Sequence, residues 1–309
     1  MIWNHYHIAS SIADALAVLG GAQGPACPVG GGTDLLLEIQ QGHRPGVDTL
    51  VDVTRIPELS RLEARDGSLV IGASVPVSRV AESALVREHA RAVAEACALI
   101  GGPQVRNSAT LGGNVAHALP AADGMIALAA MGALVEIASP QGEREEPILS
   151  LFRGPGQSAL DLSREFITAF RLPLRQSGEG SAFSRVMRPQ GVALPILNMA
   201  VWLRREGEIV ADLRVTAGPS GPRPQLASAV EEVLRGQAYT PESIAAAARA
   251  WRGSARFRSS AQRASADYRY HLCVPLFTEV VARAWQRSFV NSTHPLPPPE
   301  TGGERGAWR

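Results

Sequence analysis

Hydrophobic positions in the first third of the chain alternate between the three- to four-residue spacing of helices and the short apolar runs of strands. The apolar side chains of residues 12–19 fall on one helical face, which Ser10 or Ser11 can cap. Pro76 suits the first position of another helix, and a clear helical face follows from residue 83 to residue 100. Strands are predicted at residues 26–29, 49–53 and 69–73, and a short helix at 35–39.

The remainder of the chain changes from strand patterns to helical patterns. Strands are predicted at residues 133–138, 165–172, 196–203 and 209–216, and helices at 226–234, 241–251 and 261–285. The polar segment 174–180 is the predicted domain boundary. The last stretch, 290–309, is rich in proline and glycine, and we expect it to be a disordered tail.

Composition limits the classes of protein that fit this pattern. The chain has 309 residues, of which 45% are hydrophobic and 19% are charged, and its net charge is only +1. These values suit one large or two ordinary cores and leave no excess of positive charge for binding a nucleic acid. The longest apolar runs are shorter than the ~20 residues that span a bilayer, and the N-terminus lacks the pattern of a secretory signal. We therefore expect a cytoplasmic protein without membrane insertion.

All 30 basic residues are arginines, because the chain contains no lysine. Schiff-base chemistry and the phosphate-binding lysine of a P-loop are therefore excluded. Cys27, Cys97 and Cys273 are too few and too far apart to hold an iron–sulfur cluster or an all-cysteine zinc site. We interpret them as reduced or incidental thiols, and we predict no metal site.

A glycine-rich loop, Val29-Gly30-Gly31-Gly32-Thr33-Asp34, joins the strand at 26–29 to the helix at 35–39. Three glycines let the backbone approach a ligand and turn its N–H groups inward, which suits a pyrophosphate. A Rossmann dinucleotide site is one interpretation, because Asp52 lies 20 residues after Gly32 at the end of a strand. Its fingerprint lacks the third glycine, since Leu35 stands there, and a plain turn is the other alternative.

A second loop adds polar side chains to a further pair of glycines. It runs from Gly101 to Asp123 and includes Thr110, Gly112-Gly113 and Asn114. A hydroxyl, an amide and a carboxylate offer donors and acceptors to ligand hydroxyls and phosphates, whereas a simple turn needs none of them. Two loops that embrace one extended ligand therefore fit the sequence better than a single nucleotide fold.

At these residues the chain resembles the FAD-binding medium subunits of the molybdenum hydroxylases, the xanthine dehydrogenase and carbon monoxide dehydrogenase group. The resemblance covers nearly the whole chain, and the second loop is its most specific part. The matching motifs are Tyr6-His7, Gly31-Gly-Thr-Asp34, Val51-Asp-Val53, Ile56-Pro-Glu-Leu59, Ile71-Gly-Ala73, Pro103-Gln-Val-Arg-Asn107, Thr110-Leu-Gly-Gly-Asn114, Pro120-Ala-Ala-Asp123 and Tyr268-Arg-Tyr-His-Leu272.

The resemblance implies an α+β protein with two domains. Residues 1–176 would form a two-subdomain FAD-binding domain of the vanillyl-alcohol-oxidase and para-cresol-methylhydroxylase (PCMH) type, with subdomains near 1–55 and 56–176. Residues 177–289 would form a smaller α+β C-terminal domain of the CO dehydrogenase flavoprotein type.

The resemblance also implies which residues hold the cofactor. In that family the first loop holds the FAD pyrophosphate, which transfers to Val29, Gly30, Gly31, Gly32, Thr33 and Asp34. The second loop transfers as Thr110, Gly112, Gly113 and Asn114, with Asp123 on ribityl or ribose hydroxyls. Phe170 and Arg185 match positions near the cofactor, although Phe170 can equally be a core residue and Arg185 a surface cation. We interpret His117 as a hydrogen-bonding or packing residue.

The implied activity is electron transfer, in which FAD receives electrons from the 2Fe–2S clusters of a small subunit and passes them to NAD, a quinone, oxygen or another acceptor. The other partner would be a molybdopterin-binding large subunit, in a heterotrimer that dimerises. Asn114-Val115 is similar to xanthine dehydrogenases and Ala116-His117 to carbon monoxide dehydrogenases, so the loop selects no substrate. The segment 188–195 departs from the family pattern, which puts the acceptor in doubt.

Two other classes of function stay open beside this one. A self-sufficient FAD-dependent oxidoreductase of the same fold would bind and oxidise its own substrate. An assembly protein that has lost FAD is disfavoured, because both loops and Asp123 are intact. In the electron-transfer interpretation the flavin carries the redox chemistry, so we expect no catalytic side chain.

Overall fold

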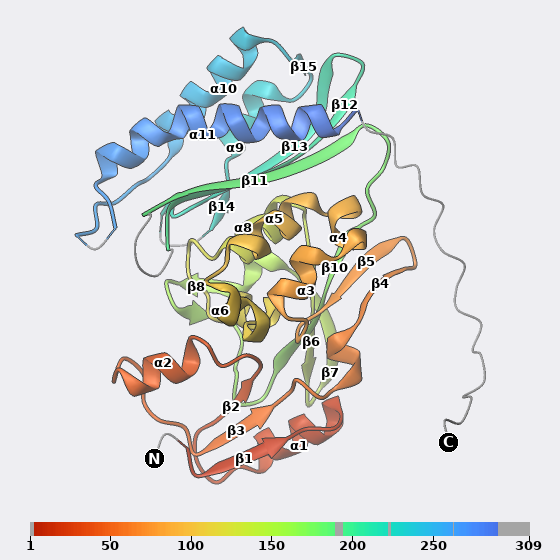
Figure 1. Ribbon diagram of the computed structural model, residues 1–309, viewed down its shortest axis with the longest axis vertical. Helices are drawn as coiled ribbons and strands as arrows, with labels where there is room; N and C mark the ends of the chain where they lie inside the picture. Colours follow the sequence, from red (N-terminus) through yellow and green to blue (C-terminus); the bar gives the residue numbers. More distant parts are fainter. Residues whose placement is uncertain (1–2, 189–193, 222–223, 262, 290–309) are drawn as a thin grey trace.

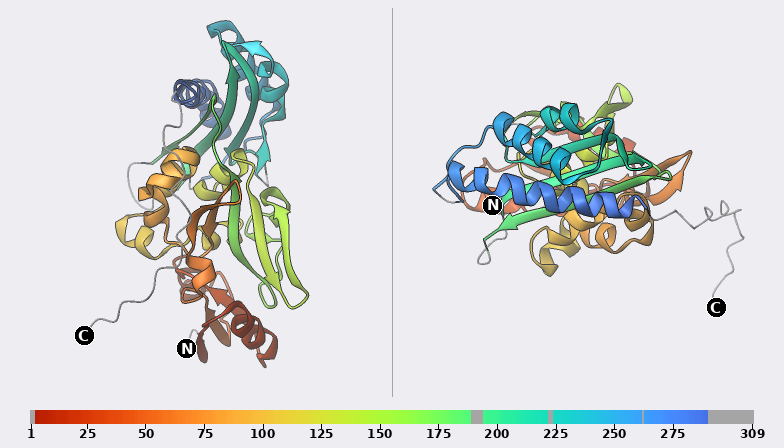
Figure 2. Two further views of the ribbon diagram at one scale, coloured as in Figure 1. Left: turned by 90° about the vertical axis from the view of Figure 1, so that its right-hand side faces the viewer. Right: turned by 90° about the horizontal axis from the view of Figure 1, so that it is seen from above.

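The computed structural model describes residues 3–188, 194–221, 224–261 and 263–289. Three larger sheets with their helices follow one another along the long axis of the molecule (Figure 1; Figure 2), and a fourth, two-stranded sheet lies within residues 152–158. Helices and parallel and antiparallel strands occur together, which confirms the predicted α+β class. The predicted tail at 290–309 lies outside the described residues.

A small parallel sheet with the strand order β1-β3-β2 forms the N-terminal part. Helix α1 buries Ala15 and Leu19, and the hydroxyl of Ser11 caps its first turn by accepting a hydrogen bond from the Asp14 N–H. The elements of this part are β1 His5–Ile8, α1 Ile12–Gly21, β2 Ala26–Val29, α2 Leu35–Gln40 and β3 Thr49–Asp52.

An antiparallel sheet with the order β4-β5-β10-β6-β7 forms the second part, with its helices on one side (Figure 2). All residues of α8 are buried, which explains the longest apolar run of the sequence. The elements are η1 Pro57–Ser60, β4 Leu62–Arg65, β5 Ser68–Gly72, α3 Val77–Glu82, α4 Ala84–His89, α5 Arg91–Leu99, α6 Pro103–Ser108, α7 Leu111–Ala116, α8 Asp123–Ala130, β6 Leu134–Ser139, β7 Gly142–Pro147, η2 Ile148–Leu151, β8 Phe152–Gly154, β9 Gln157–Ser158 and β10 Phe166–Pro173.

The third part is an antiparallel sheet with the order β11-β12-β13-β14, and β15 pairs with β13. Helices α9, α10 and α11 cover its outer face, whereas α5 and α8 of the second part pack against it from the other side (Figure 1). The sheet is therefore buried between two helical layers. Its elements are β11 Glu179–Met187, β12 Pro195–Glu206, β13 Ile209–Gly218, β14 Gln225–Leu226, α9 Ser228–Leu234, β15 Gln237–Ala238, α10 Pro241–Ser254 and α11 Ala266–Arg287.

The prediction of one helix over residues 83–100 is wrong, because the chain breaks at Ala90 into α4 and α5. Ala90 leaves helical geometry, with φ −141° and ψ 56°. The break leaves His89 at the junction with the third part, where its Nδ1 accepts a hydrogen bond from the Arg175 N–H at 3.3 Å. The sequence pattern also missed β4, β7 and β11, since charged or small residues interrupt their apolar alternation.

The three cysteines are core residues. Cys27, Cys97 and Cys273 are buried and unpaired, in agreement with their interpretation as free thiols. Burial raises the pKa of all three, that of Cys273 to about 12, so they are poor nucleophiles near neutral pH. In the described part of the chain, no helix is both long enough and apolar enough to cross a bilayer.

Glu95 of α5 joins the second part to the third. Its carboxylate accepts hydrogen bonds from Arg283 at 2.7 Å, from Arg287 at 2.6 and 3.1 Å, and from the Phe183 N–H at 3.0 Å. Arg91, one turn earlier on α5, lies 3.5 Å from the same carboxylate. Burial by itself raises the pKa of Glu95, but the hydrogen bonds from Arg287 and Phe183 and the charges of Arg287 and Arg283 outweigh burial and lower the pKa. The ionised carboxylate therefore stabilises the junction.

We predict that Glu95→Gln lowers the free energy of unfolding at pH 7 by roughly 1.5–3 kcal/mol, the range for hydrogen bonds to charged groups. Because the pKa of Glu95 is lower in the folded chain than in the unfolded chain, this contribution is present above about pH 4.5 and is lost as pH falls through the folded-state pKa. Urea unfolding of both proteins from pH 7 to pH 3.5 measures the effect. A difference that stays constant over this range would contradict the assignment.

Candidate functional site

The first glycine loop leaves a row of main-chain donors without an acceptor. It connects the buried Val29 at the end of β2 to α2, and Gly32 has a φ of +66°, which favours glycine. Among the described residues, no main-chain or side-chain acceptor takes the N–H groups of Gly31, Gly32, Thr33 or Asp34. Successive free N–H groups in a turn form a concave site for an anion.

The second glycine loop packs directly against the first. A β-carbon at Gly31 would overlap the carbonyl oxygen of Ser108, and one at Gly30 would lie 2.8 Å from Thr110 Oγ1. The contact between the loops therefore requires glycine at position 31, where the obstacle is main chain, and leaves little room for a side chain at position 30. The structure thus brings together the two loops that the sequence predicted to share one ligand.

The paired glycines of the second loop have different surroundings. Gly112 packs against Ala73, the residue that follows β5. A β-carbon on Gly112 would lie 2.7 Å from the β-carbon and the carbonyl oxygen of Ala73. Gly113 is exposed, and its N–H donates to Thr110 Oγ1 at 3.1 Å, which caps α7. The Oδ1 atom of Asn114 is buried and has no protein partner among the described residues. Gly112 serves packing, whereas Gly113 and Asn114 are available to a ligand.

Asp123 and Arg185 form a buried ion pair between α8 and β11. Their side chains are only 5% and 3% exposed. The second carboxylate oxygen of Asp123 accepts a hydrogen bond from Asn198 Nδ2 at 2.7 Å, and Asn198 is the cross-strand neighbour of Arg185. Burial raises the pKa of Asp123, while Arg185 and Asn198 act in the opposite direction. Arg185 also donates to the Leu99 carbonyl at 2.5 Å, so it is not a surface cation.

Phe170 has a packing role in the structure. It lies in the middle of β10, opposite Ile71 on one side and Val135 on the other, and it is fully buried in the main hydrophobic core. Its place as a cofactor contact stays a prediction.

His117 connects the second loop to α2 through one hydrogen bond. Its Nε2 lies 2.8 Å from Glu38 Oε1 on α2, and its Nδ1 lies 3.7 Å from Asp34 Oδ2. This geometry confirms the interpretation of His117 as a hydrogen-bonding residue. Its partner Glu38 was not predicted, because only the fold brings α2 beside the end of α7.

Asp52 does not have the free carboxylate of a Rossmann ribose site. Its Oδ2 accepts a hydrogen bond from the Tyr6 hydroxyl at 2.7 Å, and its Oδ1 accepts from the N–H and hydroxyl of Thr54. Burial and the hydrogen bond to Asp52 raise the pKa of Tyr6 to about 12, so the hydroxyl remains a donor. The arrangement ties β1 to the turn after β3.

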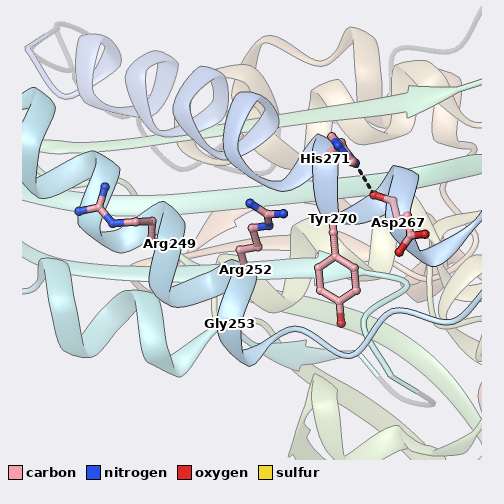
Figure 3. Close-up of a pocket in the computed structure, with 6 residues that line it drawn as sticks. All are labelled: Arg249, Arg252, Gly253, Asp267, Tyr270 and His271. Atoms are coloured by element: carbon pink, nitrogen blue, oxygen red, sulfur yellow. Dashed lines mark hydrogen bonds between the residues drawn. The ribbon is translucent and has the colours of Figure 1, made fainter.

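A hollow of about 490 Å³ lies between α10 and α11, away from the glycine loops (Figure 3). The residues that line it are Arg249, Arg252, Gly253, Asp267, Tyr270 and His271. None of the predicted cofactor residues lies there, and the Nδ1 atom of His271 is bonded to the Asp267 carbonyl at 2.8 Å. This hollow is separate from the paired loops.

Known families match both halves of the chain. Residues 3–175 match the FAD binding domain in molybdopterin dehydrogenase, and residues 181–284 match the CO dehydrogenase flavoprotein C-terminal domain. The chain belongs to the family of molybdopterin dehydrogenase FAD-binding subunits. FAD is therefore its cofactor, as the resemblance implied, and the chain is an oxidoreductase subunit.

Relatives of this FAD-binding subunit align over almost its full length. The xanthine dehydrogenase FAD-binding subunit of Escherichia coli O157:H7 is 29% identical over 90% of this chain and 95% of the relative. The nicotine 6-hydroxylase medium subunit of Paenarthrobacter nicotinovorans is 30% identical over 92% and 98%. A solved carbon monoxide dehydrogenase from Hydrogenophaga pseudoflava, which lacks the Mo-pyranopterin moiety of its cofactor, superposes with a TM-score of 0.85 at 29% identity, covering 92% of this chain and 97% of that one.

The residues of the paired loops fit FAD. The free N–H groups from Gly31 to Asp34 suit a pyrophosphate, which needs donors without a competing internal acceptor. Asn114 Oδ1 and Arg185 Nε are buried polar atoms without a partner in the described part of the chain, and they offer a polar ligand one acceptor and one donor. The main chain of the first loop offers these donors without a lysine.

We predict that Gly31→Ala raises the Kd for FAD at least about tenfold, equivalent to 1.4 kcal/mol. The added methyl group forces Ser108 away and disturbs the row of free N–H groups. Titration of the FAD-free chain, followed by flavin fluorescence, measures the Kd. Gly102→Ala is the control, since its β-carbon would meet only Gln104 Oε1, at 3.6 Å. Equal affinities of the two variants would refute the loop assignment.

We also predict that Asp123→Ala lowers the free energy of unfolding by about 3–5 kcal/mol, because it leaves the Arg185 guanidinium buried without a counter-charge. Asp212→Ala removes an ion pair with Arg235 whose side chains are 40% and 47% exposed, and it should cost about 1 kcal/mol or less. Urea unfolding of the two variants tests the comparison. A loss no larger for Asp123→Ala than for Asp212→Ala would show that the ion pair does not stabilise the fold.

Proposed function

We propose that this chain is the electron-transfer subunit of a multi-subunit molybdenum hydroxylase. In this role FAD accepts electrons from the 2Fe–2S clusters of a small subunit and delivers them to an external acceptor such as NAD, a quinone or oxygen. Bound FAD supplies the redox chemistry, and the chain binds and orients it. The supporting observation is the contact of the two glycine loops around a row of free N–H groups.

The proposal extends to the partners and the location of the complex. The other polypeptide would be a molybdopterin-binding large subunit, and the three would form a heterotrimer that dimerises in the cytoplasm. An inventory of the chain supports this division. Its three cysteines are buried and dispersed, so an iron–sulfur relay requires another polypeptide.

We propose the following organisation for the chain. Residues 1–176 form the PCMH-type FAD domain, with subdomains near 1–55 and 56–176, and residues 177–289 form the C-terminal domain. The first loop, 29–34, binds the pyrophosphate, and Thr110, Gly113 and Asn114 contribute from the second loop. Gly112 contributes through its packing on Ala73, and Asp123 and Arg185 form the polar floor of the site.

A self-sufficient flavoenzyme is the alternative function, and the described residues favour it less. Its substrate pocket would be expected beside the loops, lined by polar groups free to act in catalysis. Arg185 and Asn198 instead both bond to Asp123, and His117 is hydrogen-bonded to Glu38. The hollow between α10 and α11 lies outside the paired loops.

We predict that the isolated chain binds FAD but does not oxidise purines, aldehydes, carbon monoxide or aromatic N-heterocycles. Together with its partner subunits it should transfer electrons from one of these substrates to a dye or an NAD analogue. Steady-state assays of the isolated chain and of the reconstituted complex measure both activities. Turnover by the isolated chain at the rate of the complex would establish the self-sufficient enzyme instead.

A further inference from the structure

Strand β11 runs alongside helix α5. Three alternate residues of the strand, Ser181, Phe183 and Arg185, form hydrogen bonds with the helix, and we call this row of contacts the seam. The Ser181 hydroxyl accepts a hydrogen bond from the Ala92 N–H at 3.2 Å, and the Phe183 N–H donates to Glu95 at 3.0 Å. Arg185 then donates to the Leu99 carbonyl at 2.5 Å. Two strand residues advance about 6.6 Å and three to four helix residues about 4.5–6 Å, so a single register satisfies all three contacts.

Glu95 is the centre of this seam because it and Arg283 hold the main chain of Phe183 from both sides. Glu95 accepts the hydrogen bond of the Phe183 N–H, and Arg283 donates to the Phe183 carbonyl at 3.1 Å. Arg283 and Glu95 are themselves paired at 2.7 Å. Arg287 adds a hydrogen bond to the Ser181 carbonyl at 2.8 Å and pairs with the same carboxylate. Glu95 thus holds the Phe183 N–H directly, and it holds the Phe183 and Ser181 carbonyls through the two arginines that it pairs with.

Two residues beyond the fixed segment, Arg185 enters its buried ion pair with Asp123. Side chains two residues apart share one face of a strand, so Arg185 faces the same layer as Phe183. The ion pair is almost inaccessible to water, so solvent cannot replace Asp123 as a partner if β11 shifts. A displacement of the strand at Phe183 is thus transmitted to the guanidinium.

We propose that Glu95 is a positioning residue for the flavin site. It holds β11 in register on α5 and thereby keeps Arg185 on Asp123 and on the Leu99 carbonyl. Among the described residues no hydrogen bond or ion pair joins Glu95 to the glycine loops, so it acts through the strand. The inference rests on the proposed function in one respect, the placement of Arg185 beside the bound flavin.

Glu95→Gln in the full-length FAD-loaded chain tests the inference. The amide keeps the shape of the side chain but loses the charge that holds Arg283 and Arg287. We expect a higher Kd for FAD, an altered visible circular-dichroism band of the flavin, and a negative shift of its midpoint potential. The shift is negative because an arginine held beside the flavin favours the negative charge of the reduced form.

Glu231→Gln is the matched control. Glu231 is a helical glutamate of similar exposure, 12% against 16% for Glu95, and it pairs with Arg235 at 3.4 Å. It also accepts a hydrogen bond from a strand N–H, that of Val215 at 3.4 Å, but all of its contacts lie within the third part. We expect a loss of stability in Glu231→Gln without a change in the flavin spectrum or potential. Equal flavin effects in the two variants would overturn the proposal.

A double-variant cycle separates an action through Arg185 from general loosening. In an Arg185→Gln chain, adding Glu95→Gln should cause no further shift of the midpoint potential. If Arg185→Gln does not fold, the pair Asp123→Asn with Arg185→Gln, which leaves no buried charge, serves as the background. A further shift of the same size in this background would overturn the proposal.

The unaltered chain is assayed first, without partner subunits, for bound flavin and for oxidation of an organic substrate. Turnover of such a substrate would refute the proposed electron-transfer function and leave the role of Glu95 to be decided by the variants. An unchanged Kd, spectrum and potential in Glu95→Gln would refute the role of Glu95 and leave the proposed function intact.

Discussion

The hydrogen-bonded seam between α5 and β11 is the contact on which the relation between the second and third sheets depends. Glu95 brings two arginines of α11 and one strand N–H to a single carboxylate. Such a cluster is stabilising only while every partner is present, because each charge is partly removed from water. These directional hydrogen bonds therefore define the register of β11 on α5, beside the packing of α8 on β12 and β13.

The same requirement for close fit explains the glycine loops. A side chain at position 31 would clash with the Ser108 carbonyl, and one at position 112 would clash with Ala73. Two glycines of the loops are therefore needed for contacts within the protein. These contacts hold the first loop in a shape that leaves its N–H groups unpaired. In the proposed function, these pre-arranged donors would bind the pyrophosphate without a further loss of chain entropy, so the loop would need no lysine or arginine.

Asp123 and Arg185 connect these two features. One residue begins the buried helix α8 and the other lies near the end of β11, so their ion pair crosses the boundary between the parts that carry them. Burial of a charge is costly unless it is paired, and Asn198 and the Leu99 carbonyl supply further hydrogen bonds, which leaves Arg185 Nε as the donor without a partner among the described residues. The pair is thus a structural contact and, in the proposed function, part of the surroundings of the flavin.

The sequence by itself determined the local features. Apolar spacing and caps predicted most strands and the helices α1, α9, α10 and α11 to within a few residues, and the two loops with their motifs indicated FAD. The tertiary structure decided what depends on distant residues. Ala90 interrupts a continuous apolar face, β11 lacks a clear alternation, and Asp123 has Arg185 and Asn198 as partners. The spacing of apolar side chains indicates which face of an element is buried. The hydrogen-bond partner of a side chain can lie sixty or more residues away in the sequence, and it comes into contact only when the sheets pack together.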